Sequence, residues 1–215
     1  MIKSKADYKL FLKEDRKALG ITKPTKLLDK IFNFLSPNSL LKFQETLRKS
    51  EYYKNCSSNP FAKFYYYYIR FLLKKKSVKL GLTIPENTFG PGLAIVHYGT
   101  IVINVNSKIG ANCRIHACTN IGASGGSKKA PIIGDNVYIG PGAKIYGDIK
   151  LANNIAISAN AVVNKSFEEE NILLAGNPAV KIKNIDITTP LVKMKRFAYL
   201  SVISETFSNK SQEEK

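Results

Sequence analysis

The second half of the chain places an aliphatic residue at every sixth position. The repeat runs from Ile103 to Ile121, is interrupted, and resumes from Ile133 to Val163. Neither the 3.6-residue period of a helix nor the two-residue alternation of a plain strand produces this spacing. A six-residue period is typical of a parallel β-helix. The residues in phase are Ile103, Ile109, Ile115, Ile121, Ile133, Ile139, Ile145, Leu151, Ile157 and Val163.

Such a repeat predicts a coil with three flat sides. Three hexapeptides make one coil of about eighteen residues, so about four or five coils fit between residues 88 and 180. Several coils must stack, because one coil cannot bury its own apolar face. Pro131 and Pro141 suit corners, where proline is tolerated. Chance spacing in an ordinary β domain is the alternative, and ten aliphatic residues in phase argue against it.

The pattern changes on both sides of the repeat. Residues 1–80 predict a helical N-terminal domain, residues 81–185 the β-helix, and residues 186–215 a C-terminal helical tail. The fold class is therefore mainly β: a parallel β-helix with a helical N-terminal domain and a short C-terminal helix. The segment from Gly125 to Ala130 cannot fill inward positions, and we expect it to leave the coil as an exposed loop. The individual helices are expected at residues 7–19, 25–35, 39–53, 60–80 and 191–207.

The net charge of +17 is concentrated in the first 80 residues, which hold 19 Lys and Arg against six Asp and Glu. A solvated basic helix face, a peripheral contact with an anionic membrane surface, and a polyanionic partner are all compatible with this charge. No nucleic-acid motif is present, so no nucleic-acid partner is expected. The aromatic run Tyr65–Tyr68 favours a helix packed between neighbours; contact with a partner or a lipid interface is the alternative.

Cysteine use and hydropathy indicate the compartment. Cys56, Cys113 and Cys118 form neither a disulfide framework nor a CxxC metal motif, which suits a reducing environment. The charged N-terminus does not resemble a signal peptide, and no apolar run is long enough to span a bilayer. We expect a cytoplasmic protein, with the inner face of the membrane as an alternative location.

The chain has two histidines, His97 and His116, and both are candidates for chemistry. His97 lies six residues before Ile103 and is expected at an inward position, where a polar ring is costly unless its nitrogens have partners. His116 follows Ile115, so we expect the two rings about one strand spacing apart. A structural histidine and a general base both stay open as roles. Neither histidine has Cys or Glu at ligand spacing, so no metal is expected.

Four segments follow one another in a recognisable order: Pro91–Ile103, Ile121–Gly126, Ile139–Ile145 and Ala175–Ala179. Together they resemble the hexapeptide-repeat acyltransferases, and within them the serine acetyltransferase-like branch associated with bacterial surface polysaccharide O-acetylation. The resemblance runs over about residues 82–183. It implies a left-handed β-helix, a homotrimer with active sites between subunits, and acetyl-CoA as co-substrate. Pairing of trimers into a dimer of trimers stays open.

The resemblance also implies roles for individual residues. His97 falls on the family's catalytic histidine, which takes the proton of an acceptor hydroxyl. His116 is the second catalytic candidate, as a group that orients His97. Lys181 and Lys183 follow the last coil and are candidate partners of the coenzyme phosphates. The coenzyme groove is expected along Ala123, Ser124, Gly140, Pro141, Gly142 and Ala159.

Departures from the serine enzymes bear on the acceptor. Those enzymes carry an Asp where this chain has Val96, a second Asp at Leu82, and an Arg-His pair that holds the serine carboxylate at Lys129-Ala130. An amino-acid acceptor needs a cation for its carboxylate and an anion for its ammonium group. Losing both partners from a dry site costs several kcal/mol. A sugar hydroxyl needs neither partner.

We therefore expect an acetyl-CoA-dependent O-acetyltransferase that acts on a sugar of a bacterial capsular or other surface polysaccharide or its precursor, with His97 as general base. Serine O-acetylation is the alternative within the enzymes, and N-acetylation of an amino sugar a lesser one. A non-catalytic β-solenoid scaffold is the alternative of another class.

Overall fold

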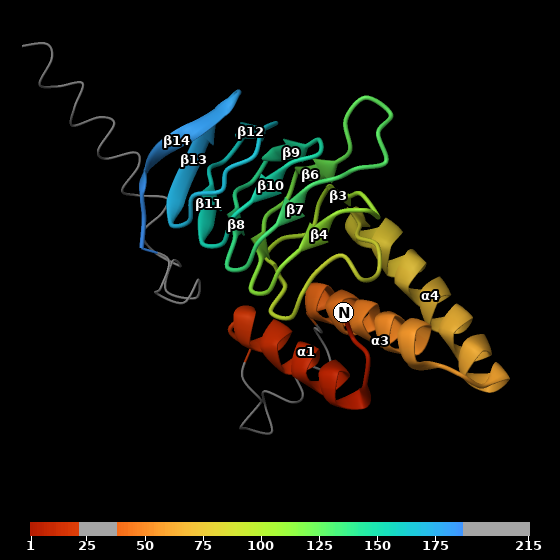
Figure 1. Ribbon diagram of the computed structural model, residues 1–215. Coiled ribbons are helices and arrows are strands. Elements are labelled where there is room, and N and C mark those ends of the chain that lie inside the picture. The colour runs from red at the N-terminus through yellow and green to blue at the C-terminus, as the bar shows by residue number, and fades with distance from the viewer. Residues whose placement is uncertain (22–37, 187–215) are drawn as a thin grey trace, which may run out of the picture.

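The computed structural model describes residues 1–21 and 38–186 of the chain. Helices come first and a stack of short strands follows (Figure 1). The helices lie where the sequence predicts them, while the predictions at residues 25–35 and 191–207 fall outside the described residues. The helices are α1 (Lys5–Ala18), α3 (Ser39–Cys56) and α4 (Pro60–Leu80). The strands are β1 (Leu82–Thr83), β2 (Ala94–Ile95), β3 (Ile101–Ile103), β4 (Lys108–Ile109), β5 (Arg114–Ile115), β6 (Thr119–Gly122), β7 (Ile132–Ile133), β8 (Tyr138–Ile139), β9 (Lys144–Tyr146), β10 (Lys150–Leu151), β11 (Ile155–Ile157), β12 (Val162–Val163), β13 (Ile172–Gly176) and β14 (Ala179–Asn184).

The strands form three sheets that the chain visits in rotation. Sheet A has the order β1-β3-β6-β9-β12, sheet B the order β10-β7-β4, and sheet C the order β14-β13-β11-β8-β5-β2. Neighbouring strands are parallel except for β13 and β14, which form an antiparallel pair at one edge of sheet C. From β2 to β12 the chain passes from sheet C to sheet A to sheet B and back again. This rotation is the three-sided coil that the six-residue repeat predicts.

Aliphatic side chains fill the inside of the coil. On sheet C, four isoleucines that lie in register on β2, β5, β8 and β11 are fully buried. Burying such a side chain contributes about 1.5–3 kcal/mol relative to leaving it exposed, so each added coil stabilises the last. The stacked residues are Ile95, Ile115, Ile139 and Ile157 on sheet C, Ile103, Ile121, Ile145 and Val163 on sheet A, and Ile109, Ile133 and Leu151 on sheet B.

Two insertions interrupt the repeat. The first lies between β2 and β3: the stacked aliphatic residue of β2 is Ile95, which lies eight positions before its counterpart Ile103 on β3 instead of six. The expected inward position of His97 is therefore wrong, because the insertion moves this residue into an exposed bend after β2. The second insertion follows β6, where residues 124–129 are exposed, as predicted for the glycine- and lysine-rich segment, whereas Ala130 at its end is buried.

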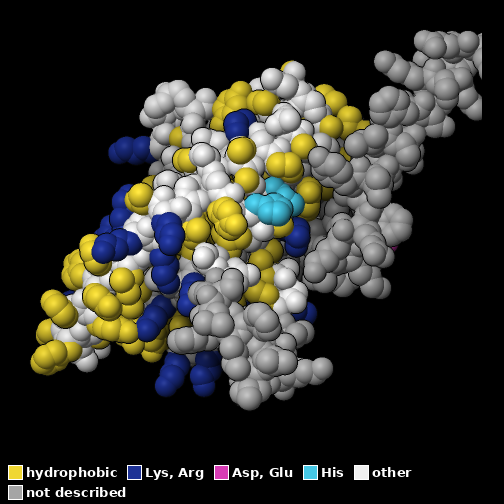
Figure 2. Space-filling view, turned by 180° about the vertical axis from the view of Figure 1, so that it is seen from behind, with side chains coloured by type: hydrophobic (Ala, Val, Ile, Leu, Met, Phe, Trp, Pro, Cys, Tyr) yellow, Lys and Arg dark blue, Asp and Glu magenta, His cyan; other side chains and the backbone are white. Residues whose placement is uncertain are grey.

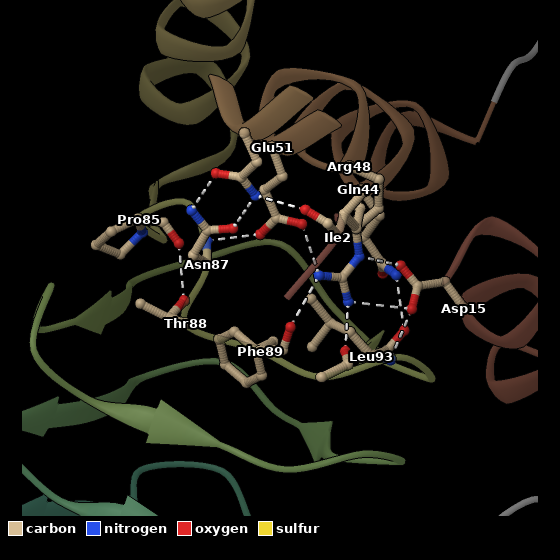
Figure 3. Close-up of polar contacts among 12 residues, drawn as sticks. Ile2, Asp15, Gln44, Arg48, Glu51, Pro85, Asn87, Thr88, Phe89 and Leu93 are labelled. Atoms are coloured by element: carbon tan, nitrogen blue, oxygen red, sulfur yellow. Dashed lines mark hydrogen bonds and ion pairs between the residues drawn. The ribbon is translucent and has the colours of Figure 1, made fainter. Parts of the chain in front are cut away.

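A buried ion network joins α1 and α3 to the segment that leads into β2 (Figure 3). The Arg48 guanidinium is fully buried and donates to Asp15 Oδ2 at 2.8 Å and to Glu51 Oε2 at 3.0 Å. It also donates to the carbonyl of Phe89 at 3.0 Å. Burial alone would lower the pKa of Arg48, but the Glu51 and Asp15 carboxylates outweigh it and raise that pKa. Asp15 Oδ1 accepts the backbone N–H of Leu93 at 2.9 Å, so the helices fix the entry to the first coil.

Helix α4 packs through one face only. Ile69 and Leu73 are buried, whereas Phe61 and Phe64 are 86% and 78% exposed. The expectation of a helix packed between neighbours is therefore only partly correct. Tyr65 packs against Tyr53 of α3, with ring centroids 4.9 Å apart, and Tyr66 donates to Glu86, whereas Tyr67 and Tyr68 are exposed. In the described parts of the chain, no helix combines the length and the apolar character needed to cross a membrane.

Candidate active site

His97 lies in the turn that joins sheet C to sheet A, between β2 and β3. The preceding strand is held by Gln44 of α3, whose Nε2 donates to the Leu93 carbonyl at 2.7 Å and whose Oε1 accepts from the Ile95 N–H at 3.2 Å. This side-chain amide satisfies the open edge of β2 where a neighbouring strand is missing. On the far side of the turn, the Gly99 N–H donates to the last carbonyl of α4 at 3.0 Å. The exposed turn is thus anchored at both ends.

The two histidine rings lie next to each other, as their spacing predicts. Their centroids are 5.9 Å apart, with an angle of 49° between the ring planes of His97 and His116. Tyr138 extends the group, because its ring centroid lies 5.1 Å from that of His116. Figure 2 shows the histidine side chains at the surface, with hydrophobic side chains around them. Sequence reasoning did not single out Tyr138. The repeat could have found it, because Tyr138 directly precedes Ile139 and is therefore the register partner of Arg114, two residues before His116.

His116 is held in its neutral form. Burial, and then the charges of Arg114 and His97, lower its pKa to about 4. Its Nε2 is buried and has no hydrogen-bond partner among the described residues. A ring with this pKa does not exchange protons efficiently near neutral pH, so His116 suits a positioning role better than an acid–base role.

The turn that carries His97 continues along the later coils as one corner of the fold, here called the C–A corner: residues 96–100, 116–118, 140–143 and 158–161. Backbone hydrogen bonds stack its layers, from the Gly142 N–H to the Ala117 carbonyl at 3.0 Å and from the Asn160 N–H to the Pro141 carbonyl at 2.9 Å. A Cβ atom on Gly140 would lie 2.7 Å from the backbone of the next layer. The C–A corner therefore brings four candidate coenzyme residues into line with the histidine: Gly140, Pro141, Gly142 and Ala159.

The remaining candidate coenzyme residues lie elsewhere on the chain. Ala123 and Ser124 follow β6, at the corner between sheets A and B. Lys181 and Lys183 lie on β14, at the opposite edge of sheet C from β2. Lys181 Nζ already pairs with Glu169 Oε1 at 2.5 Å. A single copy of the chain does not gather these four residues beside His97.

The structure shows the burial and the partners of the positions at which the chain departs from the serine enzymes. Leu82 is 2% exposed and pairs with a buried isoleucine of β3, so it belongs to the core. Val96 is partly exposed beside His97, whose ring has no hydrogen-bond partner among the described residues. Lys129 is exposed and its Nζ pairs with Asp148 Oδ2 at 2.6 Å. Within residues 1–21 and 38–186, no group of three or more His, Cys, Asp or Glu is placed to hold a metal ion.

Comparison with known proteins indicates the class of protein first. Residues 130–165 match the family model described as "Bacterial transferase hexapeptide (six repeats)". The fold agrees with this match over a longer stretch. A crystal structure of serine acetyltransferase from Brucella abortus superposes with a TM-score of 0.64 and 22% identity, over 85% of this chain and 71% of that one. The enzyme from Neisseria gonorrhoeae superposes with a TM-score of 0.65 and 23% identity, over 90% and 72%. The three-sided coil is therefore the hexapeptide-repeat acyltransferase fold.

The particular relatives are serine acetyltransferases. The Mycobacterium tuberculosis enzyme is 39% identical over 83 residues, which cover 38% of this chain and 36% of the relative. The Staphylococcus aureus enzyme is 40% identical over 84 residues, or 38% and 39% of the two chains. The similar segment thus spans well under half of these curated relatives. Solved serine acetyltransferases of the same fold include complexes with coenzyme A.

These relatives correct the expected acceptor. The curated proteins that this chain resembles in sequence are named for serine, so they contradict a sugar of a surface polysaccharide and favour the serine alternative. The expectation was wrong because it inferred the acceptor from only three substituted positions. Leu82 is a core residue, and Lys129 keeps a cation where the serine enzymes have one. The absence of particular charged residues therefore did not define the acceptor.

Proposed function

We propose that this chain is an acetyl-CoA-dependent serine O-acetyltransferase with His97 as its general base. The similarity to serine acetyltransferases supports it most, because it appears both in sequence and across most of the described fold. The position of His97 adds a chemical argument, since this exposed imidazole lies on the same corner as the candidate coenzyme residues Gly140, Pro141, Gly142 and Ala159.

The proposed reaction is a direct acyl transfer. The serine hydroxyl oxygen attacks the thioester carbonyl while His97 takes the hydroxyl proton. The tetrahedral intermediate then collapses, the C–S bond breaks, and the thiolate of coenzyme A takes the proton back from His97 as O-acetylserine is released. Backbone N–H groups stabilise the oxyanion in transfers of this kind. The His116 ring lies beside His97 and limits the orientations of its ring, and Tyr138 in turn packs against His116.

A thin ligand arm fits the layers of the C–A corner beyond the first, because several of their outer residues are small. Ala117, Gly142 and Ala159 place no bulky side chain along the stacked turns. We propose that the pantetheine arm of acetyl-CoA lies along this corner. Lys129 lies on the loop between β6 and β7, so in a site formed between subunits it supplies an exposed cation for the acceptor carboxylate, once it exchanges Asp148 for the ligand.

We further propose a homotrimer of left-handed β-helices with the site between subunits. A single chain leaves Ala123, Ser124, Lys181 and Lys183 away from His97. Packing the β-helix of a second subunit against that of the first is the simplest way to bring such residues to one ligand. Closed cyclic symmetry would give every subunit the same site.

Thiol release tests the proposed function. Purified full-length protein is mixed with acetyl-CoA and either serine, a panel of monosaccharides, or no acceptor, and free thiol is followed with a chromogenic reagent. We expect release that depends on serine, with O-acetylserine identified by mass spectrometry. Release with a monosaccharide but not with serine, or no acceptor-dependent release, would contradict the proposal.

A further inference from the structure

An exposed aromatic stripe runs along α4. Phe61, Phe64, Tyr68 and Phe71 follow one another at steps of three and four residues, so they share one face of the helix. Their exposed fractions are 86%, 78%, 52% and 55%. Val78 continues the same face toward the end of the helix at 71% exposure. Large apolar side chains that cluster on a surface in this way mark an interaction site.

The opposite face of α4 accounts for its packing in the fold. Ile69 and Leu73 are buried there. Lys76 donates to Thr46 Oγ1 of α3 at 2.6 Å. The aromatic stripe is therefore not needed to hold the helix in place. Figure 2 shows hydrophobic side chains gathered over the free end of the helix, at lower left, with Lys and Arg side chains beside them.

The charge of α4 indicates what the stripe contacts. Residues Pro60 to Leu80 contain six Lys and Arg and no Asp or Glu. Lys63, Arg70 and Lys74 are exposed along one border of the stripe. The Lys75 Nζ lies 4.8 Å from the centroid of the Phe71 ring, so a positive charge lies directly over the aromatic stripe in a cation–π contact.

A second copy of the chain does not suit this face. Two copies docked stripe to stripe would bring these cations together, and their mutual repulsion opposes such a contact. An anionic lipid surface satisfies both features at once, because aromatic side chains enter the boundary between head groups and acyl chains while Lys and Arg pair with the head groups.

We propose that the aromatic stripe of α4 docks the protein on an anionic membrane surface. The helix lies in the plane of the interface, with Phe61 and Phe64 inserted and Lys63, Arg70 and Lys74 at the head groups. The contact is peripheral and reversible, because one short stripe buries too little apolar surface for irreversible anchoring.

A tryptophan reporter tests this docking, since the chain contains no Trp. Phe64→Trp places the reporter on the stripe, and Val105→Trp places a matched one at an exposed turn of the coil, where the valine is 61% exposed. Each protein is titrated with vesicles of phosphatidylcholine and phosphatidylglycerol, and with vesicles of phosphatidylcholine alone. We expect the Phe64→Trp emission to shift to shorter wavelength and to be quenched by brominated acyl chains, only with the anionic vesicles. The Val105→Trp emission should not change.

Charge variants give a second readout that leaves the stripe intact. Lys63→Gln combined with Lys74→Gln should weaken co-sedimentation with anionic vesicles about tenfold or more. Lys150→Gln combined with Lys165→Gln removes two exposed lysines from the β-helix. This control pair should change co-sedimentation with anionic vesicles less than about twofold. Equal losses from both pairs, equal shifts of both reporters, or binding to neutral vesicles would overturn the proposal. So would a Phe64→Trp shift that appears with rising protein concentration or added RNA but not with anionic vesicles.

Discussion

Protonation of His116 couples the candidate site to folding stability. The pKa of this ring falls from its ordinary value near 6.5 to about 4 in the folded protein. Between these two pH values the unfolded chain binds a proton that the folded ring does not, so stability decreases as the pH falls through this window. The loss is smaller than for a fully buried group, because solvent partly screens the ring.

We therefore predict that His116→Gln weakens the pH dependence of stability. The wild-type urea midpoint should fall as the pH is lowered from neutral toward about 4. The variant should lose less over the same range, because glutamine does not titrate. An identical decline in the two proteins would show that the lowered pKa of His116 does not contribute.

At the residue scale, Arg48 should matter most for the helical part of the fold. Arg48→Ala leaves Asp15 and Glu51 buried without their cation, and removing one partner of a buried pair costs about 3–5 kcal/mol. Arg16→Ala is the matched control, because Arg16 pairs with Glu45 in a more exposed setting and should cost less than about 1 kcal/mol. Urea unfolding of both variants measures the difference. Similar costs would argue against a structural role for the network.

Sequence reasoning finds the candidate base but not its surroundings. His97 and His116 stand out because the chain has only these two histidines, and the structure places their rings together. Arg48 does not stand out, because it is one of 19 cations in the first 80 residues and nothing local marks its burial. Its partners Asp15 and Glu51 lie 33 and three positions away along the chain.

At the scale of the elements, the corners of the coil depend on a column of asparagines. Asn112, Asn136 and Asn154 have φ values of 56°, 57° and 59°, in the left-handed region that asparagine tolerates better than most residues. Their side chains form a ladder, with Nδ2 donating to the next Oδ1 at 3.0 and 2.9 Å. Each lies three residues before an inward isoleucine, a regularity that sequence reasoning missed.

Substitution of Asn136 should separate the two contributions. Asn136→Ala loses the ladder and places an unfavourable residue in the left-handed region, at a cost of about 2 kcal/mol. Asn136→Gly loses the ladder but keeps the conformational freedom, so it should cost about 1 kcal/mol less than Asn136→Ala. Thermal and urea unfolding measure both. A glycine variant no more stable than the alanine variant would contradict the backbone argument.

The six-residue repeat predicts the strands because each side of the coil needs one inward aliphatic residue. The repeat could not predict the insertion between β2 and β3. Counting back six residues from Ile103 gives His97, and the sequence alone does not show that this position has left the repeat. Only the structure shows that Ile95 is the inward residue on β2, because there it pairs in register with Ile115. The exposure of the aromatic residues on α4 was equally hidden, because an apolar helix face has the same sequence whether a neighbour covers it or not.

For the whole molecule, the proposed trimer makes a simple prediction. Light scattering coupled to size exclusion should give about 72 kDa, which is three times the chain mass of 23.9 kDa. A dimer of trimers would give twice that value. A monomer that retains full acetyl transfer would contradict a site assembled between subunits.

The acceptor is the property that the sequence predicted least well. The expected loss of the amino-acid partners rested on three positions, whereas the curated relatives that are 39% and 40% identical over 83 and 84 residues are named serine acetyltransferases. Loops on a rigid scaffold can rebuild a charge contact from other residues, so single substitutions are weak evidence about a substrate.

The dependence of serine acetylation on His97 tests the central claim most directly. Thiol release from acetyl-CoA in the presence of serine is measured for the wild-type protein, His97→Ala and His97→Gln under identical conditions. The account predicts that both substitutions lower kcat/KM about a hundredfold or more, with the trimer and the unfolding midpoint retained. Wild-type rates in either folded variant would show that the imidazole at the C–A corner is not the base.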